Sequence, residues 1–257
     1  MPKLTMLTAY DFNTARALAE AGIDYILVGD SLAMVGLGYT DTKQVSLGEM
    51  LIATRAVRRG APEAKVITDL PLKAASKKIN VALKAAEQII IAGANIVKVE
   101  NAEKNTLRII NKMREERIEV MGHIGYTPQT FDKPILVKDR EKLIEDARKL
   151  EEAGVMGIVL EMVPSEIAQE ITEMLSIPTI GIGAGSATSG QVLVSDDMLG
   201  RYNCINPKFL RRYANQYGEM VSAFKEYIED VKSGSFPNET ESYNNGQMVA
   251  SQPAYGA

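Results

Sequence analysis

Residues 92–100 read AGANIVKVE, in which a glycine that can end a helix leads into a β-branched run that stops at an acid. Gly commonly follows the last residue of a helix because it adopts the left-handed conformation at little cost. A continuous Val/Ile run is typical of a strand that is buried on both faces, as in a parallel sheet. The stretch therefore predicts a helix end, a turn and a buried strand in succession.

The same unit recurs along the chain, as AGIDYILVGD at 21–30, GAPEAKVITD at 60–69 and AGVMGIVLE at 153–161. Strands are also predicted at 4–10, 120–125, 178–185 and 191–196, and helices at 13–21, 47–59, 80–92, 103–116, 139–153 and 165–175. This alternation indicates parallel β/α units with right-handed crossovers. Eight strands in about 200 residues favour an α/β fold of the closed (β/α)8 TIM barrel type, with an open doubly wound sheet as the alternative.

The C-terminal part is expected to extend this single domain with helices. Residues 207–232 have an amphipathic helical pattern. Its apolar stripe consists of Phe209, Tyr213, Tyr217, Met220 and Phe224. Such a stripe packs against a core or against another subunit, and both remain open. We expect one domain over residues 1–243 and a mobile tail over 244–257, which is polar and rich in small residues.

The composition restricts the class of protein. The chain has 257 residues, 46% of them hydrophobic and 24% charged, and a net charge of −4. These values are typical of a globular protein and give no general attraction for nucleic acid or an anionic membrane. Cys204 is the only cysteine, which excludes a disulfide framework within the chain and a cysteine metal cluster. With no apolar stretch of membrane-spanning length and no signal-like N-terminus, a cytoplasmic enzyme is expected.

Four acids stand at the ends of predicted strands: Asp30, Asp69, Glu100 and Glu161. In a barrel these ends meet at one mouth, so the carboxylates would repel one another unless a cation offset their charge. Oxygen-only ligands favour Mg2+ or Mn2+. Lys98 shares a strand face with Glu100 and offers a second compensating charge. One acid alone could equally cap a helix, but the repeated spacing favours a site.

His123 is the only histidine in the sequence. A lone histidine is more often a buried structural residue than a ligand, but its place near a strand end favours the site. Without a second His or a Cys pair, a zinc hydrolase site is not expected. The glycines at 181–185 form either a tight turn at the rim or a close backbone approach to a ligand. Ser186 breaks the dinucleotide-binding pattern of glycines.

Several motifs together resemble one enzyme family. They are LTAYD (7–11), VGDSLAMVGLGY (28–39), AVRRGAP (56–62), DLP (69–71), GANIVKVE (93–100), GHIGYTPQ (122–129), LEMVP (160–164), IPTIGIGAG (177–185), GQVLV (190–194) and DMLG (197–200). Each covers a predicted strand end or its loop. In this combination and order, over about residues 4 to 243, the chain resembles the ketopantoate hydroxymethyltransferases of pantothenate biosynthesis.

The resemblance implies a Mg2+-dependent (β/α)8 barrel that transfers a hydroxymethyl group from 5,10-methylenetetrahydrofolate to 3-methyl-2-oxobutanoate, giving 2-dehydropantoate. It implies homo-oligomers, commonly decamers. It also implies roles for residues of this chain: Asp30, Asp69 and Glu100 in metal binding, Asp30, Ser31, Asp69 and Lys98 in keto-acid binding, Glu161 as proton acceptor, and His123 beside the substrate.

The chain departs from the family pattern in places. Asn101-Ala102 replaces the Gly-Gly after Glu100, residues 130–140 read TFDKPILVKDR, and Ser195-Asp196 stands where the family often has His. Two alternatives remain open. One is a carbon–carbon lyase of the isocitrate lyase and phosphoenolpyruvate mutase superfamily, and the other is a catalytically silent barrel that keeps the keto-acid pocket.

Overall fold

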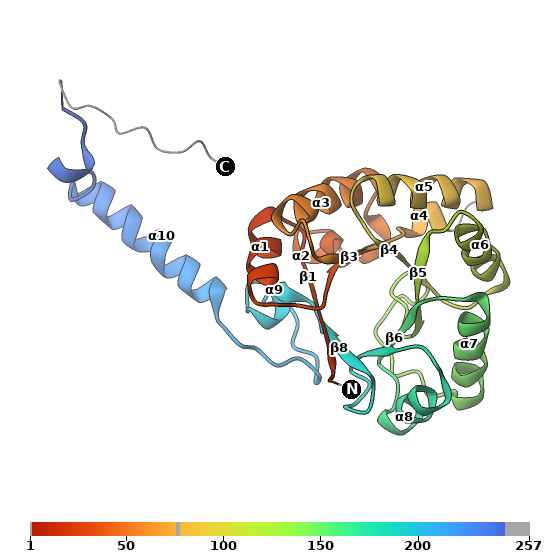
Figure 1. Cartoon of the computed structure of the whole chain (residues 1–257). Coiled ribbons are helices and arrows are strands. Elements are labelled where there is room, and N and C mark those ends of the chain that lie inside the picture. The colour runs from red at the N-terminus through yellow and green to blue at the C-terminus, as the bar shows by residue number, and fades with distance from the viewer. Residues whose placement is uncertain (1, 76–77, 245–257) are drawn as a thin grey trace.

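A closed barrel of parallel strands forms the centre of the molecule (Figure 1). The structure is a computed structural model and describes residues 2–75 and 78–244. Within them eight strands follow one another in sequence order: β1 (Leu4–Thr8), β2 (Tyr25–Val28), β3 (Lys65–Asp69), β4 (Ile96–Glu100), β5 (Glu119–Gly125), β6 (Gly157–Glu161), β7 (Thr179–Ile182) and β8 (Gly190–Leu193). Because β1 pairs with β8, the predicted barrel is confirmed and the open sheet is excluded.

Helices surround this barrel (Figure 1). The predicted ones are α1 (Phe12–Glu20), α3 (Leu47–Gly60), α5 (Ile79–Ile91), α6 (Lys104–Glu115), α7 (Arg140–Ala153) and α8 (Ser165–Met174). Short helices that the sequence did not predict are α2 (Leu32–Val35), α4 (Leu72–Ala75), α9 (Ser195–Met198), and the 3-10 turns η1 (Thr42–Gln44) and η2 (Glu239–Glu241). The strand predicted to end at 196 ends at Leu193, because the chain turns there into α9.

The inside of the barrel is filled by apolar side chains. Every strand contributes to this plug, which consists of Met6, Tyr25, Leu27, Ile67, Ile96, Met121, Val159, Ile180 and Val192. Alternate residues of a strand point to opposite faces, so the intervening Val, Ile and Leu residues pack outward under the helices. The plug closes the barrel below its carboxyl-end mouth.

The recurring glycines have two different roles. Gly154 ends α7 in the left-handed conformation, with φ of 82°, as the sequence predicts. Gly60 was expected to do the same for α3, and that expectation is wrong: it is the last residue of the helix and its φ is not positive. A Cβ on Gly60 would lie 2.3 Å from the backbone oxygen of Phe12, so glycine is needed there for the close packing of α1 on α3.

The C-terminal helix α10 (Gln216–Ser233) lies apart from the barrel (Figure 1). Residues 207–215, which were predicted to be helical, form an irregular connection with a turn at 208–209. In a single chain the apolar stripe is packed only in part: Phe209 lies against Gly183 of the barrel, whereas α10 buries none of its residues against the described part of the molecule. Packing of the rest against another subunit stays a prediction. None of the described helices has the length and apolarity needed to cross a membrane. The expected mobile tail falls, except for Asn244, outside the described residues.

Candidate active site

Polar side chains form a layer directly above the apolar plug, at the carboxyl ends of four neighbouring strands. In each strand the residue two positions beyond a plug residue is polar, so it points into the same mouth. These residues are Asp69 in β3, Lys98 in β4, His123 in β5 and Glu161 in β6. The structure thus brings these predicted site residues together, although they are distant in sequence.

Asp30 and Ser31 join this layer from the turn after β2. The backbone N–H of Asp30 donates to Asp69 Oδ2 at 2.9 Å, which ties the ends of two strands. Burial, together with the charges of Asp69 and Glu100, raises the pKa of Asp30 well above its usual range. The Ser31 hydroxyl lies 2.8 Å from the hydroxyl of Tyr10. Both residues therefore lie at the mouth, and their binding of the keto acid stays a prediction.

Lys98 is the buried cation of the layer. Its Nζ lies 3.0 Å from Asp69 Oδ1, and both side chains are almost completely buried. Burial alone would lower the pKa of Lys98, but the charges of Asp69, Glu100 and Asp30 outweigh it and raise the pKa. Burial raises the pKa of Asp69, against the opposing charge of Lys98. The lysine therefore remains protonated and holds a fixed positive charge in the mouth.

His123 lies between two carboxylates. Its Nδ1 is 3.3 Å from Glu100 Oε1 and its Nε2 is 3.3 Å from Glu161 Oε2. Burial and the charge of Lys98 oppose protonation, but the two facing carboxylates raise the pKa of His123 to about 9. Burial likewise opposes ionisation of Glu100, yet its contact with His123 lowers the pKa of that carboxyl. The two carboxylates thus favour the imidazolium form of His123 between Glu100 and Glu161, although Lys98 Nζ lies 3.4 Å from its Nδ1.

The mouth suits a hard divalent cation in ligand type and in charge. Asp69 Oδ1 and Glu100 Oε1 are buried carboxylate oxygens that face the mouth, next to Lys98 Nζ and His123 Nδ1 respectively. Carboxyl groups outnumber the positive side chains in this mouth, and burial raises the pKa of Asp30 and of Asp69, a cost of ionisation that a bound cation would offset. Among the described residues no three His, Cys, Asp or Glu side chains are drawn together as a ligand cluster, and Lys98 stands beside Asp69 instead. The residues thus fit Mg2+ by the chemistry of their donors.

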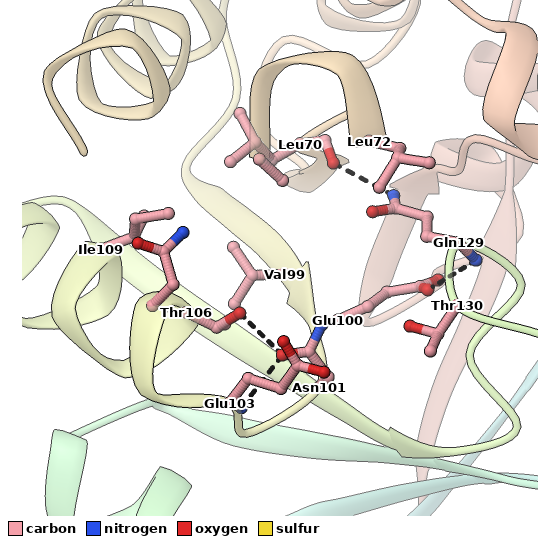
Figure 2. Close-up of a pocket in the computed structure, with 12 residues that line it drawn as sticks. Leu70, Leu72, Val99, Glu100, Asn101, Glu103, Thr106, Ile109, Gln129 and Thr130 are labelled. Atoms are coloured by element: carbon pink, nitrogen blue, oxygen red, sulfur yellow. Dashed lines mark hydrogen bonds between the residues drawn. The ribbon is translucent and has the colours of Figure 1, made fainter. Parts of the chain in front are cut away.

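Two residues of the GHIGYTPQ motif reach the site without having been singled out from the sequence. Gln129 is buried and hydrogen-bonds to Asp30 and to Glu100; Figure 2 shows the bond to Glu100. Tyr126 is half-buried, and burial together with the charges of Glu161, Glu100 and Asp30 raises its pKa to about 12. The signal was their position in the loop after β5, because loops at the carboxyl ends of barrel strands form the active site.

The departures from the family pattern have local structural explanations. Asn101 has φ of 65°, a conformation that glycine adopts most easily, and its side-chain oxygen accepts hydrogen bonds from Glu103 N at 3.0 Å and Thr106 Oγ1 at 2.7 Å. Its side chain lines a cavity of about 220 Å³ beside Glu100 (Figure 2). Ser195 lies at the other side of the barrel. Its backbone N–H donates a hydrogen bond to Thr8 Oγ1 at 2.9 Å, which ties the start of α9 to the end of β1.

The glycines at 181–185 pack against the chain itself. A Cβ on Gly183 would lie 2.7 Å from the ring of Phe209, and one on Gly185 would lie 2.6 Å from Ser165. Both glycines also have positive φ, of 63° and 77°. These contacts favour the interpretation of this run as a tight turn at the rim.

Comparison with known sequences identifies close relatives. The family model of ketopantoate hydroxymethyltransferase matches residues 1–239. The 3-methyl-2-oxobutanoate hydroxymethyltransferase of Syntrophus aciditrophicus (strain SB) is 44% identical over 249 residues, which cover 94% of this chain and 91% of that protein. The enzyme of the same name from Thermotoga neapolitana is 46% identical over 244 residues, covering 92% and 90%.

Solved structures share the fold at low sequence identity. Phosphoenolpyruvate phosphomutase from Streptomyces platensis subsp. rosaceus matches with a TM-score of 0.63 and 12% identity, over 91% of this chain and 84% of that chain. A 2,3-dimethylmalate lyase of the PEP mutase/isocitrate lyase superfamily matches with a TM-score of 0.60 and 16% identity, over 96% and 87%. These likenesses support the barrel architecture alone.

Proposed function

This chain belongs to the ketopantoate hydroxymethyltransferase family, and on that premise we propose how the mouth of its barrel performs the family's reaction. The enzyme transfers a hydroxymethyl group to 3-methyl-2-oxobutanoate, giving 2-dehydropantoate in pantothenate biosynthesis. The lyase alternative has only a shared fold in its favour. We propose 5,10-methylenetetrahydrofolate as the donor and Mg2+ as the metal, and the cytoplasmic location stays a prediction.

The observation that carries the proposal is the partial exposure of the Glu161 carboxylate beside a cluster of buried charged side chains. The side chain of Glu161 is 18% exposed, whereas those of Lys98 and His123 are nearly inaccessible. A carboxylate at the edge of the cluster can meet a C–H bond of a substrate that the inner residues hold. Glu161 is therefore assigned as the base that removes the proton from C3 of the keto acid.

The inner residues bind and orient the keto acid. Lys98 offers its ammonium to the substrate carboxylate or to the oxygen that becomes negative when C3 loses its proton. Ser31, held by Tyr10, can donate a hydrogen bond to the same end of the substrate. The apolar plug beneath them excludes water from below.

Asp30, Asp69 and Glu100 are assigned as the residues that hold the metal. When bound, a divalent cation supplies Lewis-acid polarisation of the keto group and stabilises the enolate charge. Asp69 and Glu100 each present a buried carboxylate oxygen to the mouth, of the type that a hard divalent cation prefers. His123 has a separate role, because its Nε2 lies 3.3 Å from Glu161 Oε2 and can hold that carboxylate at the edge of the mouth.

We also propose that the enzyme is a homo-oligomer, with the decamer as the expected size. The face of α10 formed by Met220, Phe224, Tyr227, Ile228 and Val231 is 41–58% exposed at each of these residues. A contiguous apolar surface of this kind is typical of an interface. A second copy of the chain would cover this apolar face of α10, which the barrel of the same chain leaves exposed.

The function is tested by proton NMR of 3-methyl-2-oxobutanoate in D2O with enzyme and Mg2+, followed by addition of methylenetetrahydrofolate. We expect the methyl doublet to collapse as C3 exchanges, and signals of the hydroxymethylated product to appear after the donor is added. Exchange without product would contradict the proposed donor. With neither signal from folded protein that contains metal, the silent barrel would replace the enzyme.

A further inference from the structure

Gln129 connects the ends of three neighbouring strands. Its side-chain amide donates to Asp30 Oδ2 at 2.9 Å and to the backbone oxygen of Leu70 at 3.1 Å. Its backbone N–H donates to Glu100 Oε2 at 2.9 Å. Figure 2 shows the side chain extended between Leu70 and Glu100, and only 8% of the residue is exposed. A polar residue buried to this extent with all its donors directed at one site is fixed in place.

The carboxylates of this site share one pattern of hydrogen bonding. One oxygen of each accepts from an amide: Asp30 Oδ2 from the Gln129 side chain, Glu100 Oε2 from the Gln129 backbone, and Asp69 Oδ2 from the Asp30 backbone. The other oxygens of Asp69 and Glu100 are buried and face charged side chains: Lys98 Nζ lies 3.0 Å from Asp69 Oδ1, and His123 Nδ1 lies 3.3 Å from Glu100 Oε1. Amide donors thus fix one edge of each carboxylate, and for Asp69 and Glu100 they direct the opposite edge into the charged centre of the mouth.

The contact to Asp30 depends entirely on the side chain of Gln129. The other two carboxylates are held by backbone N–H groups, which no substitution short of proline removes. The charges of Asp69 and Glu100 lie close to Asp30 and would push its side chain away from them. A neutral amide donor holds Asp30 in place without adding to the charge of the cluster.

We propose that Gln129 is a positioning residue whose side-chain amide holds the Asp30 carboxylate in the orientation that binds the divalent cation. This inference rests on the proposed function, in which Asp30 is a metal ligand. Residues that orient the ligands of a metal typically contribute about 10- to 100-fold to its affinity. The amide of Gln129 therefore prepares the site before metal and keto acid arrive.

The test uses two substitutions, Gln129→Ala and Gln129→Met, in the full-length enzyme. Ala removes the side chain, whereas Met keeps nearly its length and volume but cannot donate a hydrogen bond. Both retain the backbone N–H that donates to Glu100. The readout is Mn2+ binding to the substrate-free enzyme, followed by electron paramagnetic resonance, with circular dichroism to establish folding. Gln169→Ala, which truncates an exposed glutamine on α8, is the control.

We expect both variants to need about 10- to 100-fold more Mn2+ for half-saturation, while Gln169→Ala binds as the wild type does. The C3 exchange of each Gln129 variant should recover at high Mn2+, because the metal restores the orientation of Asp30 by mass action. Wild-type affinity in both variants would overturn the proposal. So would weak binding by Gln129→Ala with normal binding by Gln129→Met, since filled space rather than the amide would then matter.

Failure of this inference is distinguishable from failure of the proposed function. Wild-type enzyme that binds Mn2+ but does not exchange the C3 proton would contradict the function and still allow the Gln129 comparison. If the wild-type enzyme exchanges the C3 proton and both Gln129 variants bind Mn2+ with wild-type affinity, the proposed function stands and the positioning role of Gln129 is wrong. Wild-type enzyme that binds no Mn2+ would overturn the inference outright.

Discussion

Glu161 combines access to the substrate with contact to a fixed cation. Its carboxylate lies at the open edge of the mouth, 3.3 Å from His123 Nε2. Glu161→Gln keeps the shape of the side chain but removes the base, so C3 exchange should fall by roughly 10²- to 10⁴-fold. The measurement is loss of the C3 proton signal in D2O, with keto-acid binding followed by calorimetry.

The control for this substitution is Glu166→Gln, an exposed glutamate at the start of α8. It should exchange C3 at the wild-type rate. If Glu161→Gln binds the keto acid and still exchanges C3 normally, Glu161 is not the base.

The charge of His123 should make stability depend on pH. Its pKa in the folded protein is about 9, against 6.5 for a free side chain, because Glu100 and Glu161 outweigh burial and the charge of Lys98. The imidazolium thus stabilises the fold fully below about pH 6.5, and this contribution is lost as the pH rises through about 9. His123→Gln should therefore lower the free energy of unfolding more at about pH 6 than at about pH 10.

Urea denaturation of both proteins at the two pH values, with a chelator present, measures this difference. Equal destabilisation by His123→Gln at both pH values would mean that the histidine is neutral in the fold. The interpretation of His123 as a bridge between two carboxylates would then be wrong.

At the scale of single elements, α3 offers a matched pair of glycines. A Cβ on Gly60 would collide with the backbone oxygen of Phe12 at 2.3 Å, whereas one on Gly48 would meet only Ser46 Oγ at 3.8 Å. Gly60→Ala should destabilise the protein by about 1–3 kcal/mol, because α1 must move away from α3. Gly48→Ala should leave stability unchanged or slightly raise it. Urea denaturation measures both, and equal effects would contradict the packing role of Gly60.

The start of α6 shows how one element absorbs a departure from the family sequence. Asn101 occupies a left-handed position and uses its side-chain oxygen to accept hydrogen bonds from Glu103 and Thr106. Asn is the residue other than glycine that tolerates this conformation best, because its short polar side chain bonds locally. The turn that precedes α6 is therefore kept although the glycine pair is lost.

At the scale of the whole molecule, α10 is the feature that one chain does not explain. Phe224 lies in its apolar face and is 58% exposed. If a second copy covers this face, Phe224→Glu should place a charge in the interface and shift the protein to smaller species. Light scattering measures the mass as a multiple of the 28.1 kDa chain. Lys225→Ala, at the adjacent position of the helix, should leave the mass unchanged, and a monomeric wild type would contradict the oligomer.

The sequence alone was sufficient for the barrel and for the charged residues that the strand ends bring to its mouth, but not for Gln129 and Tyr126 in the loop after β5. Strands such as 96–100 and 157–161 coincide with the predicted runs. A continuous run of Val, Ile and Leu is typical of a parallel strand that is buried on both faces. The convergence of Asp69, Lys98 and Glu161 follows from the same pattern, since the carboxyl ends of barrel strands meet at one edge. Local rules of periodicity and topology act on neighbouring residues, so a sequence can express them.

Only the tertiary structure decided what depends on contacts between distant segments. Gly60 ends no left-handed turn but makes room for Phe12, which lies 48 residues earlier in the sequence. The charge of His123 depends on carboxylates from two other strands, and the role of Gln129 depends on its reach to Asp30, 99 residues away. Packing distance, charge compensation and hydrogen-bond direction are properties of the assembled mouth, and no local pattern in the sequence encodes them.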